Sequence, residues 1–422
     1  MARIGIRKTA LSLAVAGVFA GGVSQAHASA FALIEQSASG LGNSYAGAAA
    51  AAEDASTIFY NPAGMSLLPG GMQVSAGLAL INLSAKFSDS GSSQNLGRPL
   101  GNNGGNAGDL SAVPNVYFAM DVAPDWKAGV GVSVPFGLKT EYDPAWMGRF
   151  QAIKSDISTL NINPSASYKL NETVSLGFGL NYQSIDAEFT NAVNIGASEE
   201  MADIKAKDNS GWGYNLGAMF QLASDTRLGV SYRSSIKYHL TGTATFSPPN
   251  IPFASGNVSI DIKMPDSASV GLQHRLNPGW TLLADVTRTG WSKIKELRID
   301  LDTGGTLSNT PENFKSTWRV GVGAVHRYDD AWSIKMGLAY DQTPVNDTDR
   351  TARLPDNNRL WLSVGGQYKL SKDGTLDFGY AHLFIKNASI NQNGGNAGAN
   401  GQLVGTYKGS VDILGVQFAY RF

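Results

Sequence analysis

The chain ends in the stretch Leu414-Gly-Val-Gln-Phe-Ala-Tyr-Arg-Phe422, in which apolar or aromatic residues alternate strictly with small or polar ones. An alternation with a period of two is typical of a β-strand whose two faces meet different surroundings. Chain ends usually fray, yet this strand keeps its apolar face up to Phe422. Such a strand fits the closing seam of a membrane-spanning β-barrel, although the stretch alone also fits an edge strand of a soluble sheet.

The other end of the chain predicts export. A cationic start is followed by an uncharged apolar run over 10–23 and by the small-x-small sequence Ala26-His27-Ala28. This pattern predicts a secretory signal peptide over residues 1–28, and a second cleavage site follows Ala30. The alternative, a retained membrane anchor, is disfavoured because the apolar run is too short to span a bilayer.

Composition narrows the class of protein further. The chain has no cysteine, so disulfides contribute nothing to its stability, and its net charge of −1 argues against nucleic acid as a partner. A mean hydropathy of −0.12 is too polar for a helical membrane protein. The 49 glycines and 15 tyrosines favour strands and turns, and no linker divides the chain.

From residue 72 onward the sequence consists of alternating segments joined by connectors that are short and long in turn. This sided pattern is typical of an outer-membrane barrel, with turns in the periplasm and loops outside. We therefore predict an all-β fold, a 14-stranded antiparallel transmembrane β-barrel over 72–422. The expected strands are 72–88, 111–122, 126–137, 156–170, 173–190, 211–223, 226–246, 256–276, 279–300, 314–328, 331–344, 357–370, 374–390 and 407–422.

Residues 29–71 do not alternate. They are rich in small residues, have high helix propensity over 46–55, and reach a turn signal at Asn61-Pro62. A barrel of fourteen strands leaves a wide lumen, and compact small-residue chain is suitable material to fill it. We expect an N-terminal luminal hatch, or plug, over 29–71; the alternative is a periplasmic tail.

This segment also carries a family resemblance. The sequences Phe31-Ala-Leu-Ile-Glu35, Ser39-Gly-Leu-Gly42, Tyr45-Ala-Gly47 and Asn61-Pro62-Ala63-Gly64 resemble the hatch of the FadL family of outer-membrane transporters. The resemblance covers the whole mature chain. Members carry hydrophobic molecules, mainly long-chain fatty acids, and a TodX-like branch carries monoaromatic hydrocarbons. The resemblance implies passive capture at outer loops, transfer to a pocket near the hatch start, where Phe31 would touch ligand, and lateral exit through the barrel wall.

The third predicted strand contains Pro135-Phe136-Gly137. Proline has no N–H for the strand ladder, so within a closed barrel it must open a gap or a bulge. Its position matches the third-strand kink that the resemblance implies as the lateral opening. The alternative is that Pro135 simply ends the strand.

The candidate ligand contacts are residues of one outer loop and basic side chains expected to point into the barrel. The loop over 142–150 is rich in apolar side chains, which suggests either a ligand-capture surface or loop packing; its candidates are Trp146, Met147, Arg149 and Phe150. A fatty-acid carboxylate would favour an inward cation, for which the candidates are Arg227, Arg233, Arg319 and Lys369. The resemblance does not identify which of these matches the family's basic ligand contacts. The fifth strand, where the resemblance would place an arginine, reads Gln183-Ser-Ile-Asp186, so neutral hydrocarbons are retained as alternative cargo.

Other chemistry has little support in the sequence. The histidines are scattered without metal-ligand spacing, and no nucleotide motif occurs, so we expect no cofactor and no enzyme activity. A barrel phospholipase using His239 and Ser259 and a general porin are the alternatives. The expected partners are hydrophobic small molecules, outer-membrane lipids and the barrel assembly machinery, which would recognise Phe422. We expect a monomer.

Overall fold

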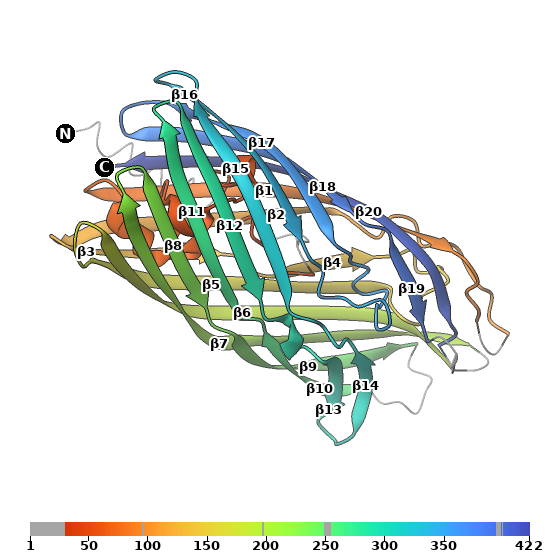
Figure 1. The fold of residues 1–422 in the computed structure, drawn as a ribbon. Coiled ribbons are helices and arrows are strands. Elements are labelled where there is room, and N and C mark those ends of the chain that lie inside the picture. Colours follow the sequence, from red (N-terminus) through yellow and green to blue (C-terminus); the bar gives the residue numbers. More distant parts are fainter. Residues whose placement is uncertain (1–29, 95–96, 196–197, 249–254, 394–397, 399) are drawn as a thin grey trace, which may run out of the picture.

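The computed structural model describes residues 30–94, 97–195, 198–248, 255–393, 398 and 400–422. The predicted signal peptide lies outside these residues. Twenty strand segments form one sheet that closes into an antiparallel barrel of fourteen strands, because six of the strands are interrupted and count as two segments each (Figure 1). The fourteen-stranded antiparallel barrel predicted from the alternation is therefore confirmed.

The uninterrupted strands are β1 (Met72–Asp89), β2 (Leu110–Ala123), β5 (Lys154–Lys169), β6 (Val174–Asn194), β7 (Glu199–Ala223), β16 (Trp332–Asp341), β17 (Arg359–Lys369) and β20 (Leu403–Arg421). The interrupted strands are β3 (Trp126–Ser133) with β4 (Gly137–Glu141), β8 (Thr226–Arg233) with β9 (Ile236–Ser247), β10 (Gly256–Met264) with β11 (Ser267–Asn277), β12 (Trp280–Thr289) with β13 (Glu296–Leu301), β14 (Thr306–Pro311) with β15 (Thr317–Arg327), and β18 (Gly374–Ile385) with β19 (Ala388–Gln392).

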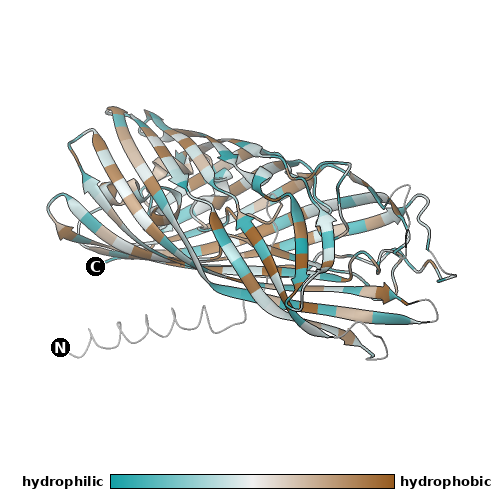
Figure 2. Cartoon of the chain, turned by 90° about the horizontal axis from the view of Figure 1, so that it is seen from below, coloured by the Kyte–Doolittle hydropathy of each residue, from teal (hydrophilic) through white to brown (hydrophobic). Residues whose placement is uncertain are grey.

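The terminal strand closes the barrel as its alternation predicts. β20 pairs with β1 from Gln73 opposite Arg421 to Asp89 opposite Gly405. The Phe422 amide donates to the carbonyl of Met72 at 2.8 Å, so the two ends of the barrel wall lie side by side. Leu414 is 58% exposed and Ile413 is fully buried, so the apolar face of this strand points outward, as it does in a membrane barrel. Figure 2 shows the same mixture of hydrophobic and hydrophilic bands along the strands.

Several expected loops are shorter than predicted, because the strands continue beyond their predicted ends. Residues 191–210 were expected to be a loop, but β6 runs to Asn194 and β7 begins at Glu199. In this extension buried Ala202 and Ile204 alternate with the more exposed Asp203 and Lys205, so a charged outer face replaces the apolar one and the ladder is kept.

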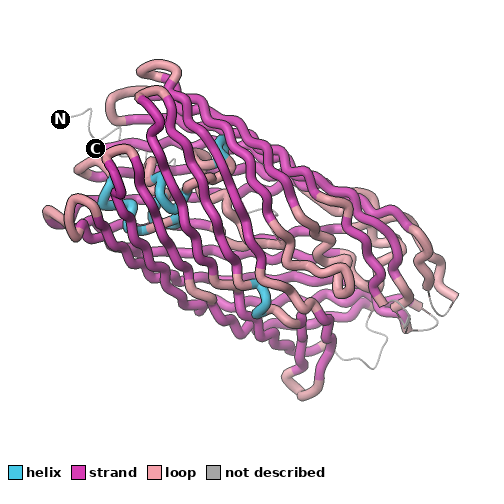
Figure 3. Tube along the Cα trace, in the orientation of Figure 1, coloured by secondary structure: helices cyan, strands magenta, loops and turns pink. Residues whose placement is uncertain are grey.

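The N-terminal segment, residues 30–71, lies inside the barrel (Figure 3). It contains four short helices: η1 (Leu41–Asn43), α2 (Ala48–Ala51), α3 (Thr57–Tyr60) and η2 (Pro62–Leu67). They contact opposite parts of the wall, since η1 packs on β15 to β18, α2 packs on β8, β11 and β12, and η2 packs on β3, β5, β6 and β7.

The helix expected over 46–55 is shorter than its alanine content indicates. Gly47 and Ala52, which bound α2, both have positive φ, and this left-handed conformation ends a helix. Packing against the wall here outweighs the local propensity of alanine.

No helix in the described part of the chain is long and apolar enough to cross a membrane.

Candidate functional site

The third barrel strand is broken at Val134-Pro135-Phe136. Ser133 at the end of β3 lies opposite Asn161 of β5, and Gly137 at the start of β4 lies opposite Ser158. Three residues of the broken strand therefore face two of β5, which is a β-bulge. The Thr159 hydroxyl takes over the lost backbone bonds, since it accepts from the Phe136 amide at 3.0 Å and donates to the Phe136 carbonyl at 2.8 Å.

The break also affects the pairing of the third strand with its other neighbour, β2. β2 pairs with β3 only from Val116 to Ala123, and its earlier residues 110–115 pair with β1 alone. Farther along, Lys139 of β4 contacts Asp109 at 2.6 Å and the Glu141 amide donates to Ala107 at 3.0 Å. Between these points, no ladder among the described residues joins β2 to β4.

The start of the N-terminal segment covers this break from inside. Ala32 forms a β-bridge with Phe136, the Leu33 amide donates to the Pro135 carbonyl at 2.8 Å, and the Gly137 amide donates to the Phe31 carbonyl at 2.9 Å. The Gln36 side chain adds two bonds to the backbone of Val134. Residues 31–36 thus satisfy backbone groups that the wall itself leaves unpaired.

Three aromatic rings mark the boundary between two cavities beside the break. Phe31 and Trp291 have ring centroids 4.7 Å apart, and Phe136 lies 6.2 Å from each of them. Trp291 belongs to η3 (Trp291–Lys293), in the break between β12 and β13. Phe31 lines one cavity, whereas Phe136 and Trp291 line the other. We call these three residues the aromatic boundary.

The first space, the apolar cavity, has a volume of about 50 Å³ and is bounded mainly by aliphatic and aromatic side chains. They include Phe31, Leu138, Ile157, Ile185, Phe189, Leu240, Ile260, Ile294, Leu297 and Phe314. Three ionisable residues also line it: Glu296, Glu312 and Arg353. Burial raises the pKa of the Glu312 carboxyl to about 8, against the opposing effect of the neighbouring Arg353 guanidinium. Arg353 lies above the ring of Phe189, and burial lowers its pKa to about 10.

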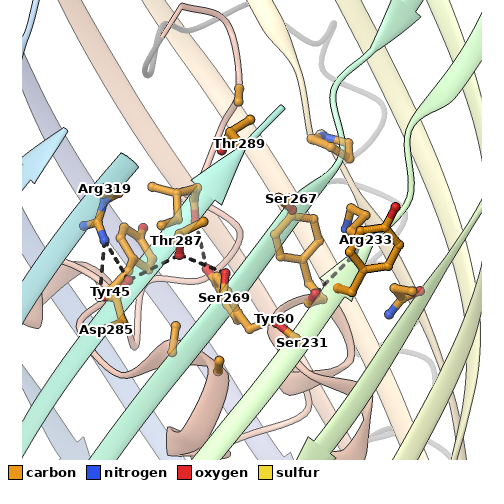
Figure 4. Close-up of a pocket in the computed structure, with 18 of the residues that line it drawn as sticks. Tyr45, Tyr60, Ser231, Arg233, Ser267, Ser269, Asp285, Thr287, Thr289 and Arg319 are labelled. Atoms are coloured by element: carbon orange, nitrogen blue, oxygen red, sulfur yellow. Dashed lines mark hydrogen bonds and ion pairs between the residues drawn. The ribbon is translucent and has the colours of Figure 1, made fainter. Parts of the chain in front are cut away.

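The second space, the hydroxyl cavity, has a volume of about 150 Å³ and reaches Pro135 and Phe136. Hydroxyl groups dominate its polar lining: Tyr45, Tyr60, Ser231, Tyr232, Ser267, Ser269, Thr287 and Thr289. Figure 4 shows Arg319 with Asp285 at one end of the labelled row of residues and Arg233 at the other. Between them the hydroxyls of Ser269 and Thr287 are hydrogen bonded at 2.8 Å.

The predicted outer-loop residues do not join Phe31. Trp146, Met147, Arg149 and Phe150 are all buried, and Trp146 stacks on Tyr142 at 3.9 Å. Arg149 donates to Glu199 and to the carbonyls of Pro99 and Leu100, and so ties its own loop to the loop before β2 and to the start of β7. In this structure the loop-packing alternative describes these side chains, and none of them lines either cavity.

Asn61 joins α3 to η2, and Pro62 to Gly64 form the first turn of η2. The Asn61 amide donates to the carbonyls of Ala49, Ala218 and Val230, and its oxygen accepts from the Ala63 amide. This one side chain therefore joins α2, the start of η2 and two wall strands. A Cβ added at Gly64 would meet the Thr57 hydroxyl at 2.0 Å, which explains the need for glycine there.

The four candidate cations have different surroundings. Lys369 is exposed at the end of β17, and Arg227 donates to the carbonyls of Ala50 and Ala51. Arg319 and Arg233 both line the hydroxyl cavity. Trp291, Arg353 and Glu312 were not singled out by the sequence, although Gly290 inside an alternating stretch was a usable sign of a broken strand.

The alternative pair of His239 and Ser259 is not assembled as a catalytic site. His239 Nδ1 lies 2.8 Å from Asp261, and Ser259 is opposite Thr241 in the ladder. Within the described residues, no group of three or more His, Cys, Asp or Glu is placed to hold a metal ion.

Comparison with known proteins supports a single assignment. Residues 19–422 match the family model of outer membrane protein transport proteins, OMPP1/FadL/TodX. The chain is 28% identical to a long-chain fatty acid transport protein of Escherichia coli O6:H1, over 98% of each chain. Its fold is similar to that of a Pseudomonas aeruginosa FadL homologue, with a TM-score of 0.86, 22% identity and coverage of 93% and 100%. It is also similar to the Pseudomonas putida toluene transporter TodX, with a TM-score of 0.69, 17% identity and coverage of 94% and 100%.

Proposed function

Because this chain belongs to the OMPP1/FadL/TodX family of outer-membrane transport proteins, we propose that it is a passive channel for hydrophobic compounds, with long-chain fatty acids as its principal cargo. It is a transporter of the outer membrane and not an enzyme. The observation that carries the proposal is the break at Pro135, covered from inside by residues 31–36 and adjoined by the two cavities.

In the proposed route, cargo is captured at the outer loops and then occupies the apolar cavity beside Phe31. Its apolar lining suits an alkyl chain, since each buried CH₂ contributes about 0.8 kcal/mol. The buried side chains of 142–150 would shape the loops in this scheme, and their contact with cargo stays a prediction.

The proposed exit is sideways. Residues 29–71 would act as the hatch that closes the lumen toward the periplasm, because their helices contact the wall on opposite sides. Cargo would pass the aromatic boundary and leave between β2 and β4, once residues 31–36 move away from Pro135. This route keeps an alkyl chain out of water throughout.

Uptake of radiolabelled oleate and toluene by a deletion strain, with and without the protein, tests the cargo. Oleate uptake that depends on the protein supports the proposal. Uptake of toluene alone would favour monoaromatic hydrocarbons, and a large single-channel conductance of the purified protein would favour a general porin.

The register offers a sharp test of the lateral exit. Deleting Pro135 alone leaves two residues opposite two of β5, so the ladder can run without a bulge. We expect the deletion variant to fold, as judged by heat-modifiable gel mobility, and to lose oleate uptake. The matched control is Pro135→Ala, which keeps three residues opposite two of β5 and so leaves the break intact. Normal uptake by the Pro135 deletion would contradict the lateral exit.

A further inference from the structure

We propose that Arg233 is the residue that recognises the carboxylate of an amphipathic cargo in the hydroxyl cavity, next to the break at Pro135. The inference rests on the proposed function and narrows it, because it assigns the channel a preference for acids over neutral compounds of the same length.

Arg233 has only neutral partners among the described residues. Its guanidinium donates to the Asn181 side-chain oxygen and, at 2.9 Å, to the Phe59 carbonyl, and it lies 4.4 Å above the Phe59 ring. A guanidinium has five N–H groups, and two are used here. A cation in a barrel interior, away from bulk water, is costly unless an anion compensates it.

The other arginine of this cavity differs in this respect. Arg319 lies 3.4 Å from both carboxylate oxygens of Asp285, and Asp341 is directly opposite it in the strand pairing. Arg319 also donates to the Ser44 carbonyl of the N-terminal segment. Its charge therefore serves to join the segment to the wall, and it leaves no need for a further anion.

The other two arginines considered as carboxylate-binding residues either have a partner already or lie outside both cavities. In the apolar cavity Arg353 has Glu312 as a neighbouring carboxyl group, and it donates to Lys154, Ser155 and Asn191. Arg227 lines neither cavity and holds the carbonyl end of α2. Among the described arginines that line the two cavities, Arg233 alone has no carboxyl group beside it.

The surroundings of Arg233 suit a carboxylate with an alkyl chain. Ser231 lines the same cavity and supplies a hydroxyl donor, and Figure 4 shows it at the end of the cavity that holds Arg233. Leu33, Pro135 and Phe136 supply an apolar side. Arginine binds carboxylates through two parallel hydrogen bonds, so both oxygens of a fatty acid can be held.

The experiment compares two ligands of equal chain length, oleate and oleyl alcohol, on purified full-length protein in detergent. Wild-type protein should bind oleate at least about tenfold more tightly, the size of one charge-assisted pair. Arg233→Gln should lose about tenfold in oleate affinity and change oleyl alcohol affinity less than about twofold. Arg233→Lys should fall between, because it keeps the charge without the planar fork. Arg227→Gln is the matched control and should behave as wild type.

Three outcomes would overturn the assignment. The first is that wild-type protein binds oleate and oleyl alcohol with equal affinity. The second is that Arg233→Gln lowers the affinity for both ligands equally. The third is that Arg233→Gln lowers the affinity for neither ligand. The wild-type comparison stands even if a variant fails to fold. Failure of the proposed function looks different, since wild-type protein would then bind and take up neither ligand.

Discussion

The N-terminal segment is held to the barrel in two different ways on its two sides. Toward β16, β18 and β20 the contacts are charged: Lys335 lies 2.5 Å from Glu53 and 3.2 Å from Asp377, and Asp54 accepts from Gln417 at 2.8 Å. Toward β3, β7 and β8, none of the described contacts of the segment is an ion pair, and we call this the neutral side. The backbone of residues 31–33 and the amides of Gln36 and Asn61 make neutral bonds there. The cations Lys127, Arg227 and Arg233 donate only to carbonyls of the segment.

The difference indicates which side can move. Separating a buried ion pair leaves charges without partners, at a cost of about 3–5 kcal/mol. A single neutral hydrogen bond contributes about 0.5–1.5 kcal/mol and can be exchanged for one to water or ligand. The neutral side, which faces the break at Pro135, is therefore the side that opens at lower free energy, while the charged side keeps the segment inside the barrel.

Lys335→Met has the largest expected effect, and it tests whether the charged side holds the N-terminal segment inside the barrel. It leaves the buried Asp377 without its cation and removes the bonds of Lys335 to Glu53 and to the Ser39 carbonyl, and we expect the charged side to lose about 3–5 kcal/mol. Planar-bilayer recordings should then show large, frequent openings that wild-type protein lacks. The triple variant Lys335→Met, Glu53→Gln, Asp377→Asn removes all three charges and should restore a quiet channel. A quiet single variant would show that the ion pairs do not hold the segment.

Asn61→Ala tests the neutral side. The change removes bonds to three carbonyls and to the Ala63 amide, at an expected cost of about 2–3 kcal/mol to the docking of α2 and η2. Amide hydrogen exchange of residues 48–67 should accelerate, while β16 to β20 stay protected. Asn61→Asp, of equal size, should be worse because it places a carboxylate against carbonyl oxygens. Uniform acceleration across the barrel would contradict a local role.

Acidity should tighten the neutral side. Burial raises the pKa of Glu35 from 4.5 to about 7, and neither carboxyl oxygen has a hydrogen-bond partner among the described residues. Because the folded-state pKa is the higher one, the stabilisation is complete below about pH 4.5 and is lost as pH rises through 7. Between pH 5 and pH 8 the loss is on the order of 2 kcal/mol.

Hydrogen exchange of residues 31–37, corrected for the intrinsic effect of pH, measures this loss. Protection should fall between pH 5 and pH 8 in wild-type protein and stay constant in Glu35→Gln. The same pH dependence in both proteins would assign it to another group.

Phe31→Ala has the smallest expected effect, and it concerns cargo. The ring lines the apolar cavity and belongs to the aromatic boundary, so its loss removes apolar contact area. We expect oleate affinity to fall roughly tenfold, about 1.4 kcal/mol, with the barrel unchanged. Phe31→Leu keeps most of the apolar area and is the control. Tighter oleate binding in Phe31→Ala would mean that the ring competes with cargo for the cavity.

The alternation of side chains predicted the barrel well, because each strand is a local pattern with a lipid face and a lumen face. Pro135 was also readable, since a missing N–H is a property of one residue. Trp291 was not, because residues 279–300 alternate as if β12 and β13 were one strand. The pairing of Arg319 with Asp285, and the absence of a carboxylate beside Arg233, depend on the register between distant strands, which no local pattern contains.

The seam between β1 and β20 sets the order of events during biogenesis. It joins the first strand of the wall to the last, so the cylinder cannot shut before the carboxyl terminus has been delivered. Residues 30–71 precede β1 and lie inside the finished barrel. The pairing of β1 with β20 is therefore also the step that encloses them. A chain that lacks β20 would therefore expose the edges of β1 and β18 and leave residues 30–71 unenclosed, a combination prone to aggregation and proteolysis.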